Sequence, residues 1–251
     1  MHVGTVAVAV MALLAGCSSA GPSGQPTATS GASSPGGAAT SEASSPGGAA
    51  TSGATNPNAG LKSGTQLKTF LLSAKDLPAG FKVTPDAVRD SGDVFGPPST
   101  ATSPFRSACQ SLDTNAWIEG AGIGSASFAQ TGFTNSYGNE IDAEIDSFRG
   151  ADPQLVMTNL RKLFAACATY HTTTNGVRTT VKVVARAGPR IGDDSVKAVL
   201  TSPVWQGGST LAAVRVGNAV VSVLYASSKS DLGAKATNLA ATIVQRLQAA
   251  R

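Results

Sequence analysis

The sequence predicts an α+β fold in which an antiparallel sheet of about five to seven strands carries helices packed mainly on one face. Two observations lead to this prediction. Four Val-rich segments of strand length follow one another in the second half of the chain, and Gly217-Asn218 joins the last two as a hairpin turn. Helical patterns stand before and after these strands and do not alternate with them, which excludes a doubly wound parallel sheet.

The first residues resemble the signal of a bacterial lipoprotein. A short apolar run from Val3 to Ala15 ends in Leu14-Ala15-Gly16-Cys17, which has the form of a lipobox, although its first residues carry only His2 and no Lys or Arg. The run is too short to span a membrane and has the length of a signal-peptide core. We therefore expect residues 1–16 to be a cleaved signal peptide and Cys17 to carry the lipid. An ordinary signal with an incidental cysteine is the alternative.

Residues 17–60 consist almost entirely of Ser, Gly, Ala, Thr and Pro, and the segment Ala32–Ser41 recurs at Ala43–Ser52. Such a composition buries too little apolar surface to offset the entropy of an ordered chain. We expect a disordered tether whose r.m.s. reach is roughly 35–40 Å. It would hold a domain away from the extracytoplasmic face of the cell membrane, either as a bare spacer or as a glycosylated one.

Residues 61–251 are predicted to form one globular domain. Helices are expected around Leu67–Ala74, from Asp152 as N-cap to Cys167, and from Ser230 to the end. Asp90 to Pro104 is rich in turn residues and predicts a long loop. Strands are expected at 81–88, 125–134, 140–148, 178–187, 195–201, 210–216 and 219–226, with the second and third joined around Tyr137-Gly138-Asn139.

Cys109 and Cys167 are the two cysteines of the predicted domain. An exported chain meets an oxidising compartment, where one pair of cysteines indicates a structural disulfide more often than a redox or metal site. We therefore predict a Cys109–Cys167 bridge that fixes the middle helix.

The charge and the composition exclude several functions. The chain has 19 Lys and Arg against 15 Asp and Glu, a net charge of +4, and its cations are scattered without interleaved aromatic residues. Nucleic acid is therefore not an expected partner, whereas weak attraction to an anionic envelope surface is compatible with the charge. His171 is the single histidine of the predicted domain, so no zinc site or catalytic triad is expected, and no nucleophile elbow, metal or cofactor motif is present.

Four acids alternate along one predicted strand: Glu140, Asp142, Glu144 and Asp146. They share one face, because successive strand residues point to opposite sides. The preferred interpretation is the solvated face of a half-buried strand. The alternative is a surface for a cation or a basic partner, because four neighbouring acids repel one another.

The order of motifs resembles a group of actinobacterial lipoproteins similar to the extracellular sensor domain of the mycobacterial transmembrane serine/threonine kinase of the H type. The motifs are Leu77-Pro78-Ala79-Gly80-Phe81, a helix ending in Cys167, Gly192-Asp193-Asp194, and Val214 to Val221 before a last helix. The resemblance implies an antiparallel sheet flanked by helices, with a cleft for a ligand. Those sensor domains have two disulfides and this domain can have one, so no ligand-site residues carry over.

The sequence thus favours a non-enzymatic, lipid-anchored domain that binds a small molecule or a cell-envelope component. An envelope hydrolase is the alternative, and its weakness is the missing set of nucleophile, base or metal ligands. A third hypothesis is an adaptor for another envelope protein.

Overall fold

The computed structural model describes residues 56–99, 105–174, 176–229 and 233–251. The predicted signal peptide, Cys17 and most of the predicted tether lie outside the described residues. At the start of the described chain, Asn58 already contacts the domain, because its Oδ1 accepts a hydrogen bond from Nε of Arg149 at 2.9 Å.

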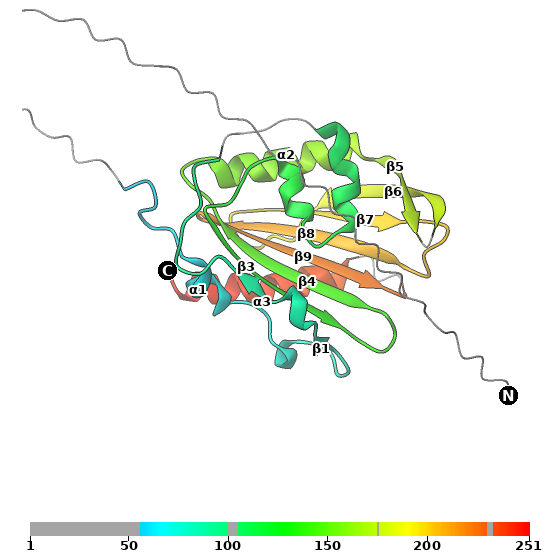
Figure 1. Ribbon diagram of the computed structural model, residues 1–251, viewed down its shortest axis with the longest axis horizontal. Helices are drawn as coiled ribbons and strands as arrows, with labels where there is room; N and C mark the ends of the chain where they lie inside the picture. Colours follow the sequence, from blue (N-terminus) through cyan, green and yellow to red (C-terminus); the bar gives the residue numbers. More distant parts are fainter. Residues whose placement is uncertain (1–55, 100–104, 175, 230–232) are drawn as a thin grey trace, which may run out of the picture. The chain divides into compact units, whose positions relative to one another are not determined.

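The described residues form a nine-stranded sheet in which every pair of neighbouring strands is antiparallel, in the order β1-β3-β4-β9-β8-β7-β6-β5, and β2 also pairs with β3 (Figure 1). The strands are β1 Lys82–Val83, β2 Arg89–Asp90, β3 Ser127–Thr134, β4 Glu140–Ser147, β5 Thr169–Thr174, β6 Val177–Ala187, β7 Asp194–Thr201, β8 Gly208–Val216 and β9 Ala219–Ser227. The α+β class is confirmed, but the sheet is larger than the five to seven strands expected.

Three α-helices and four short 3₁₀ helices accompany this sheet in the described residues. They are α1 Gly64–Lys68, α2 Asp152–Ala166 and α3 Ala234–Ala249, with η1 Ala74–Asp76, η2 Pro85–Ala87, η3 Phe105–Asp113 and η4 Trp117–Ala121. None of these helices combines the length and the apolar composition needed to cross a membrane.

The helices cover both faces of the sheet, which corrects the expectation of one covered face. α2 packs on β6, β7 and β8 together with η3 and η4, whereas α3 lies on the opposite face against β8 and β9 (Figure 1). The residues of β9 therefore alternate between two cores: Val220 and Leu224 pack under α2, and Val221 and Val223 pack under α3. The centre of the sheet is apolar on both sides because both sides are buried.

The long strands and helices are where the sequence places them, within a few residues. The hairpin of β3 and β4 turns at Tyr137-Gly138-Asn139, with Gly138 at φ 73°, and the hairpin of β8 and β9 turns at Gly217-Asn218. α2 begins one residue earlier than expected, since Ala151 and not Asp152 is its N-cap.

The differences are in the short elements. The predicted helix around Leu67–Ala74 is only a five-residue α1, which a capping box between Ser63 and Gln66 begins. The predicted strand 81–88 is divided into β1, η2 and β2. β5 was not predicted, because its sequence TYHTTT lacks the alternation of a half-buried strand.

Candidate functional site

A cavity of about 670 Å³ lies over the sheet at β3 and β4, on the face that carries α2. Its floor is set by strand register. Gln130 of β3 lies opposite Glu144 of β4, and Arg89 of β2 lies on the other side of Gln130, so these three side chains form one row. Phe128 and Asp146 form the next row. A guanidinium, an amide, two carboxyls and an aromatic ring therefore share one floor.

The upper wall of the cavity comes from segments outside the sheet. η4 and the residues after it contribute Ile118, Glu119 and Ile123, and a Pro97-Pro98-Ser99 segment closes another side. Apolar and polar side chains are thus mixed around the cavity, which suits a ligand that has both kinds of surface.

Hydrogen bonds fix this wall to the scaffold. Nδ2 of Asn159 in α2 donates to the carbonyl of Ala121 at 2.9 Å, which ties η4 to α2. Arg149, just after β4, donates through Nη2 to the carbonyl of Gly96 at 2.6 Å and through Nη1 to that of Pro97 at 3.1 Å. The floor and the wall therefore keep a defined separation.

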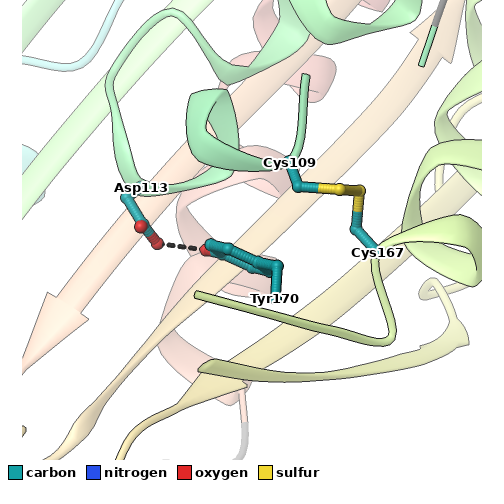
Figure 2. Close-up of a disulfide and its surroundings, with 4 residues drawn as sticks. All are labelled: Cys109, Asp113, Cys167 and Tyr170. Carbon is teal, nitrogen blue, oxygen red and sulfur yellow. Dashed lines mark hydrogen bonds between the residues drawn. A yellow bond between two sulfur atoms is a disulfide. The ribbon is translucent and has the colours of Figure 1, made fainter. Parts of the chain in front are cut away.

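The disulfide restrains the same wall through η3. Cys109 of η3 is bonded to Cys167 at the end of α2, with their Cα atoms 5.5 Å apart (Figure 2). Beside it, the hydroxyl of Tyr170 donates a hydrogen bond to Oδ1 of Asp113, which joins β5 to the end of η3. Since η3 packs against η4, these links also restrain the cavity wall.

The acids of β4 are not on a solvated face, which corrects the preferred interpretation of the sequence. Asp142 and Asp146 are buried, at 5% and 4% exposure, and Glu144 is half-buried, whereas Glu140 is exposed. The physical reason is that segments outside the sheet cover this face. The wall of η4 and its neighbours lies over Glu144 and Asp146. Ala87 of η2 lies near Asp142. Alternation along β4 establishes only that the acids share a face.

Burial changes the charge state of these acids. Burial, together with repulsion from the nearby Asp146 carboxylate, raises the pKa of Glu144 to about 9, although Arg89 opposes the shift. Burial also raises the pKa values of Asp142 and Asp146 to about 7. At neutral pH the floor therefore carries a protonated Glu144, which can donate a hydrogen bond as well as accept one.

Two buried polar atoms of the floor have no hydrogen-bond partner among the described residues. Gln130 is 3% exposed; its Oε1 accepts from Nη2 of Arg89 at 2.9 Å, but its Nε2 is unpaired. Oδ2 of Asp146 is unpaired as well. Buried groups of this kind are normally satisfied by protein, ordered water or a ligand. The floor therefore offers one donor and one acceptor that the fold leaves unused.

The single histidine of the predicted domain lies away from this cavity. His171 is exposed on β5. Trp117 is buried in the core and stacks on Phe164 with ring centroids 6.0 Å apart. Among the described residues, no group of three or more His, Cys, Asp or Glu side chains is placed to hold a metal ion. Asp142, Glu144 and Asp146 are close neighbours but do not form such a group.

Sequence reasoning missed Arg89, Gln130 and Glu119 as cavity residues. The first two lie in segments of mixed composition, and Glu119 belongs to a 3₁₀ helix that was not predicted. No sequence spacing could have predicted that these three residues lie together. Strand pairing and the packing of η4 over the sheet bring them into one cavity.

A solved structure shows the same arrangement of elements. The crystal structure of the extracellular domain of PknH from Mycobacterium tuberculosis superposes with a TM-score of 0.57 at 15% sequence identity, over 75% of this chain and 97% of that chain. The chain has the fold of this extracellular domain. No protein-family model matches the sequence, and no curated protein sequence matches it either. At this level of identity the likeness concerns the fold, and the site has to be argued from the residues of this chain.

Proposed function

We propose that the chain is a non-catalytic, extracytoplasmic binding domain, held at the membrane by a lipid on Cys17, and that it takes a small molecule or a cell-envelope component in the β3–β4 cavity. The observation that carries the proposal is the cavity floor. There, the unpaired Nε2 of Gln130 and the unpaired Oδ2 of Asp146 lie beside a half-buried Glu144 whose pKa is raised by burial.

Two further observations support the location. The Cys109–Cys167 disulfide is typical of a protein that folds outside the cytoplasm. The fold resembles a domain that is extracellular in PknH. The expected lipobox at Leu14-Ala15-Gly16-Cys17 would supply the anchor.

The ligand we propose has an apolar part and a hydrogen-bonding part. Ile118, Ile123 and Phe128 would contact the apolar part. Gln130 Nε2 would donate to an oxygen of the ligand, and Asp146 Oδ2 would accept from a hydroxyl or an amine. Such a ligand would satisfy both buried atoms at once.

Substitution of Ser125 tests the cavity. Its side chain lines the cavity together with Asp146, whose pKa burial raises, and lies close enough to that carboxyl to oppose the shift. Ser125→Trp would fill the space, whereas the matched control Ser125→Ala removes the hydroxyl and keeps the space. The chain, purified from its native membrane, is analysed by mass spectrometry for a co-purifying small molecule. We expect this molecule with the wild type and with Ser125→Ala, and its loss with Ser125→Trp. Equal recovery from all three would refute the cavity as the site.

An envelope hydrolase is the second candidate, and one observation favours it. Carboxyls with raised pKa values in a cavity are suited to act as general acids, and Glu144 lies beside Asp146 and near Glu119. Glu144→Gln separates the two functions. If the domain only binds, this variant retains a bound molecule unchanged over time, as the wild type does. If the domain hydrolyses its ligand, the wild type converts it and the variant accumulates it intact.

A further inference from the structure

Among the described residues, no helix packs closely on β5, β6 and β7 on the face of the sheet that carries α3. α3 packs against β8 and β9, and α2 lies on the other side of the sheet (Figure 1). On β6, Val181 and Val183 are buried under α2, so the intervening residues point to the uncovered side. Half of one sheet face is therefore a broad surface of strand side chains.

This uncovered half is basic. It carries Arg178, Lys182 and Arg186 from β6 and Lys197 from β7, of which the first three are exposed. We call these four residues the basic face. No Asp or Glu of the described strands β5 to β7 points to this side, since Asp194 lies on the opposite side, where it pairs with Arg161 of α2.

The cations of the basic face are not paired with acids that the structure describes. Elsewhere in the described residues some cations do form ion pairs, as Arg246 does with Asp76 and Arg215 with Asp193. None of the four residues of the basic face forms an ion pair with another described residue. Its positive charge is therefore not neutralised by the fold.

Strand register brings two of these cations directly opposite each other. Arg186 pairs with Lys197, on the same face of adjacent strands. Like charges in this position destabilise a sheet unless an anion lies between or above them. Around them, Lys182 lies between Thr169 and Thr201, and Arg178 lies opposite Thr173. Hydroxyl and cationic donors thus alternate over the surface, which suits an array of phosphate oxygens.

We propose that the basic face docks on the anionic phospholipid surface of the membrane. A membrane presents many phosphates in a plane, and each Lys or Arg near such a surface adds to the attraction. The half-exposed Val184, at 46% exposure, lies among the cations and would contact the headgroup layer. The inference is independent of the cavity, and the proposed tether is long enough to let the domain reach the membrane.

The test uses the chain from residue 17 onward with Cys17→Ser, so that no lipid is attached. Binding is measured by co-sedimentation with vesicles of phosphatidylglycerol and phosphatidylcholine and with vesicles of phosphatidylcholine alone. We expect binding to the anionic vesicles only, and loss of this binding at high salt. Lys182→Glu with Arg186→Glu should weaken the binding on the order of tenfold or more.

A matched control separates the effect of where the charges lie from the effect of the net charge on vesicle binding. Lys75→Glu with Lys162→Glu makes the same change in charge at exposed sites outside the basic face, and it should affect the binding much less. Lys182→Gln with Arg186→Gln gives a milder variant, and all variants are compared by melting temperature. Equal binding to neutral vesicles, or an equal loss in the control, would overturn the proposal. The proposal would also be overturned if the wild type sediments as a dimer and the basic-face variants sediment as monomers. The basic face would then be covered by a second copy of the chain.

Discussion

At the scale of single residues, Glu144 is the side chain on which the chemistry of the cavity depends. It points from β4 to the same side as the buried Asp146, and burial and repulsion together raise its pKa to about 9. Protonation of Glu144 therefore removes its charge repulsion with its neighbours in the row at neutral pH. The raised pKa values of Asp142 and Asp146, about 7, reduce the negative charge of the row further.

These shifts predict that the domain loses stability as the pH rises. A carboxyl whose pKa is higher in the folded than in the unfolded state binds more protons when the domain is folded. Its contribution to the free energy of unfolding is therefore complete below about pH 4. This contribution is lost as the pH rises through the folded pKa, which is about 7 for Asp146 and about 9 for Glu144. Glu144→Gln removes part of this dependence. We expect it to raise the melting temperature at about pH 9 more than at about pH 5.

The control for this prediction is Asp86→Asn, which neutralises an exposed acid of η2. Its melting temperature should follow the wild type at both pH values. If Glu144→Gln also follows the wild type throughout, Glu144 is ionised in the folded state and the description of the floor is wrong.

At the scale of elements, the most consequential ones are short. η4 has no strong sequence signal, yet it forms much of the wall that converts an open sheet face into a cavity, and η3 packs against it. α2 holds them in place through Asn159 and through the disulfide. On the other face, α3 packs against the segment after α1 and also hydrogen-bonds it through Arg246.

The disulfide gives a prediction for the cavity wall. Its cysteines are 58 residues apart, and closing a loop of this size stabilises a fold by at most about 4 kcal/mol. We expect Cys109→Ala with Cys167→Ala to lower the melting temperature and to speed amide hydrogen exchange in η3 and η4 more than in α3. A reducing agent should lower the melting temperature of the wild type and leave that of the double variant unchanged.

Arg246 gives a prediction for the opposite face. It donates to the carbonyl of Leu71 at 2.7 Å and to Oδ1 of Asp76 at 2.6 Å, and so links α3 to the chain after α1. Arg246→Ala removes the donor to this carbonyl and to Oδ1 of Asp76, and should cost about 1–3 kcal/mol in the free energy of unfolding. Gln245→Ala, at the exposed neighbouring position of α3, should cost far less. Denaturant unfolding with equal costs for both would contradict the link.

At the scale of the whole molecule, the domain has two cores on opposite sides of one sheet and two separate surfaces for which we propose a function. The cavity lies on the α2 face over β3 and β4, and the basic face lies on the α3 side over β5 to β7. The sheet separates them, so the proposed docking and the proposed ligand binding would not compete for the same surface.

Attachment of the whole molecule to the membrane is tested at Cys17. Cys17→Ser removes the thiol that would accept the lipid, so we expect the chain to move from the membrane fraction to the soluble fraction at physiological salt. The measurement is fractionation followed by immunoblotting, with the wild type as reference. Retention that persists at high salt would contradict lipid anchoring, whereas retention that salt abolishes is what the basic face alone would give.

The sequence by itself determined the α+β class, the two hairpins, the two long helices and the cysteines available for pairing. These depend on local periodicity and turn residues, which act over a few positions, as at Gly138 and Gly217. Only the tertiary structure decided that helices cover both faces, that β5 extends the sheet and that Asp146 is buried. The alternation of β4 places its acids on one face, but whether that face meets water depends on η4 and Pro97–Ser99, which fold over it from elsewhere in the chain.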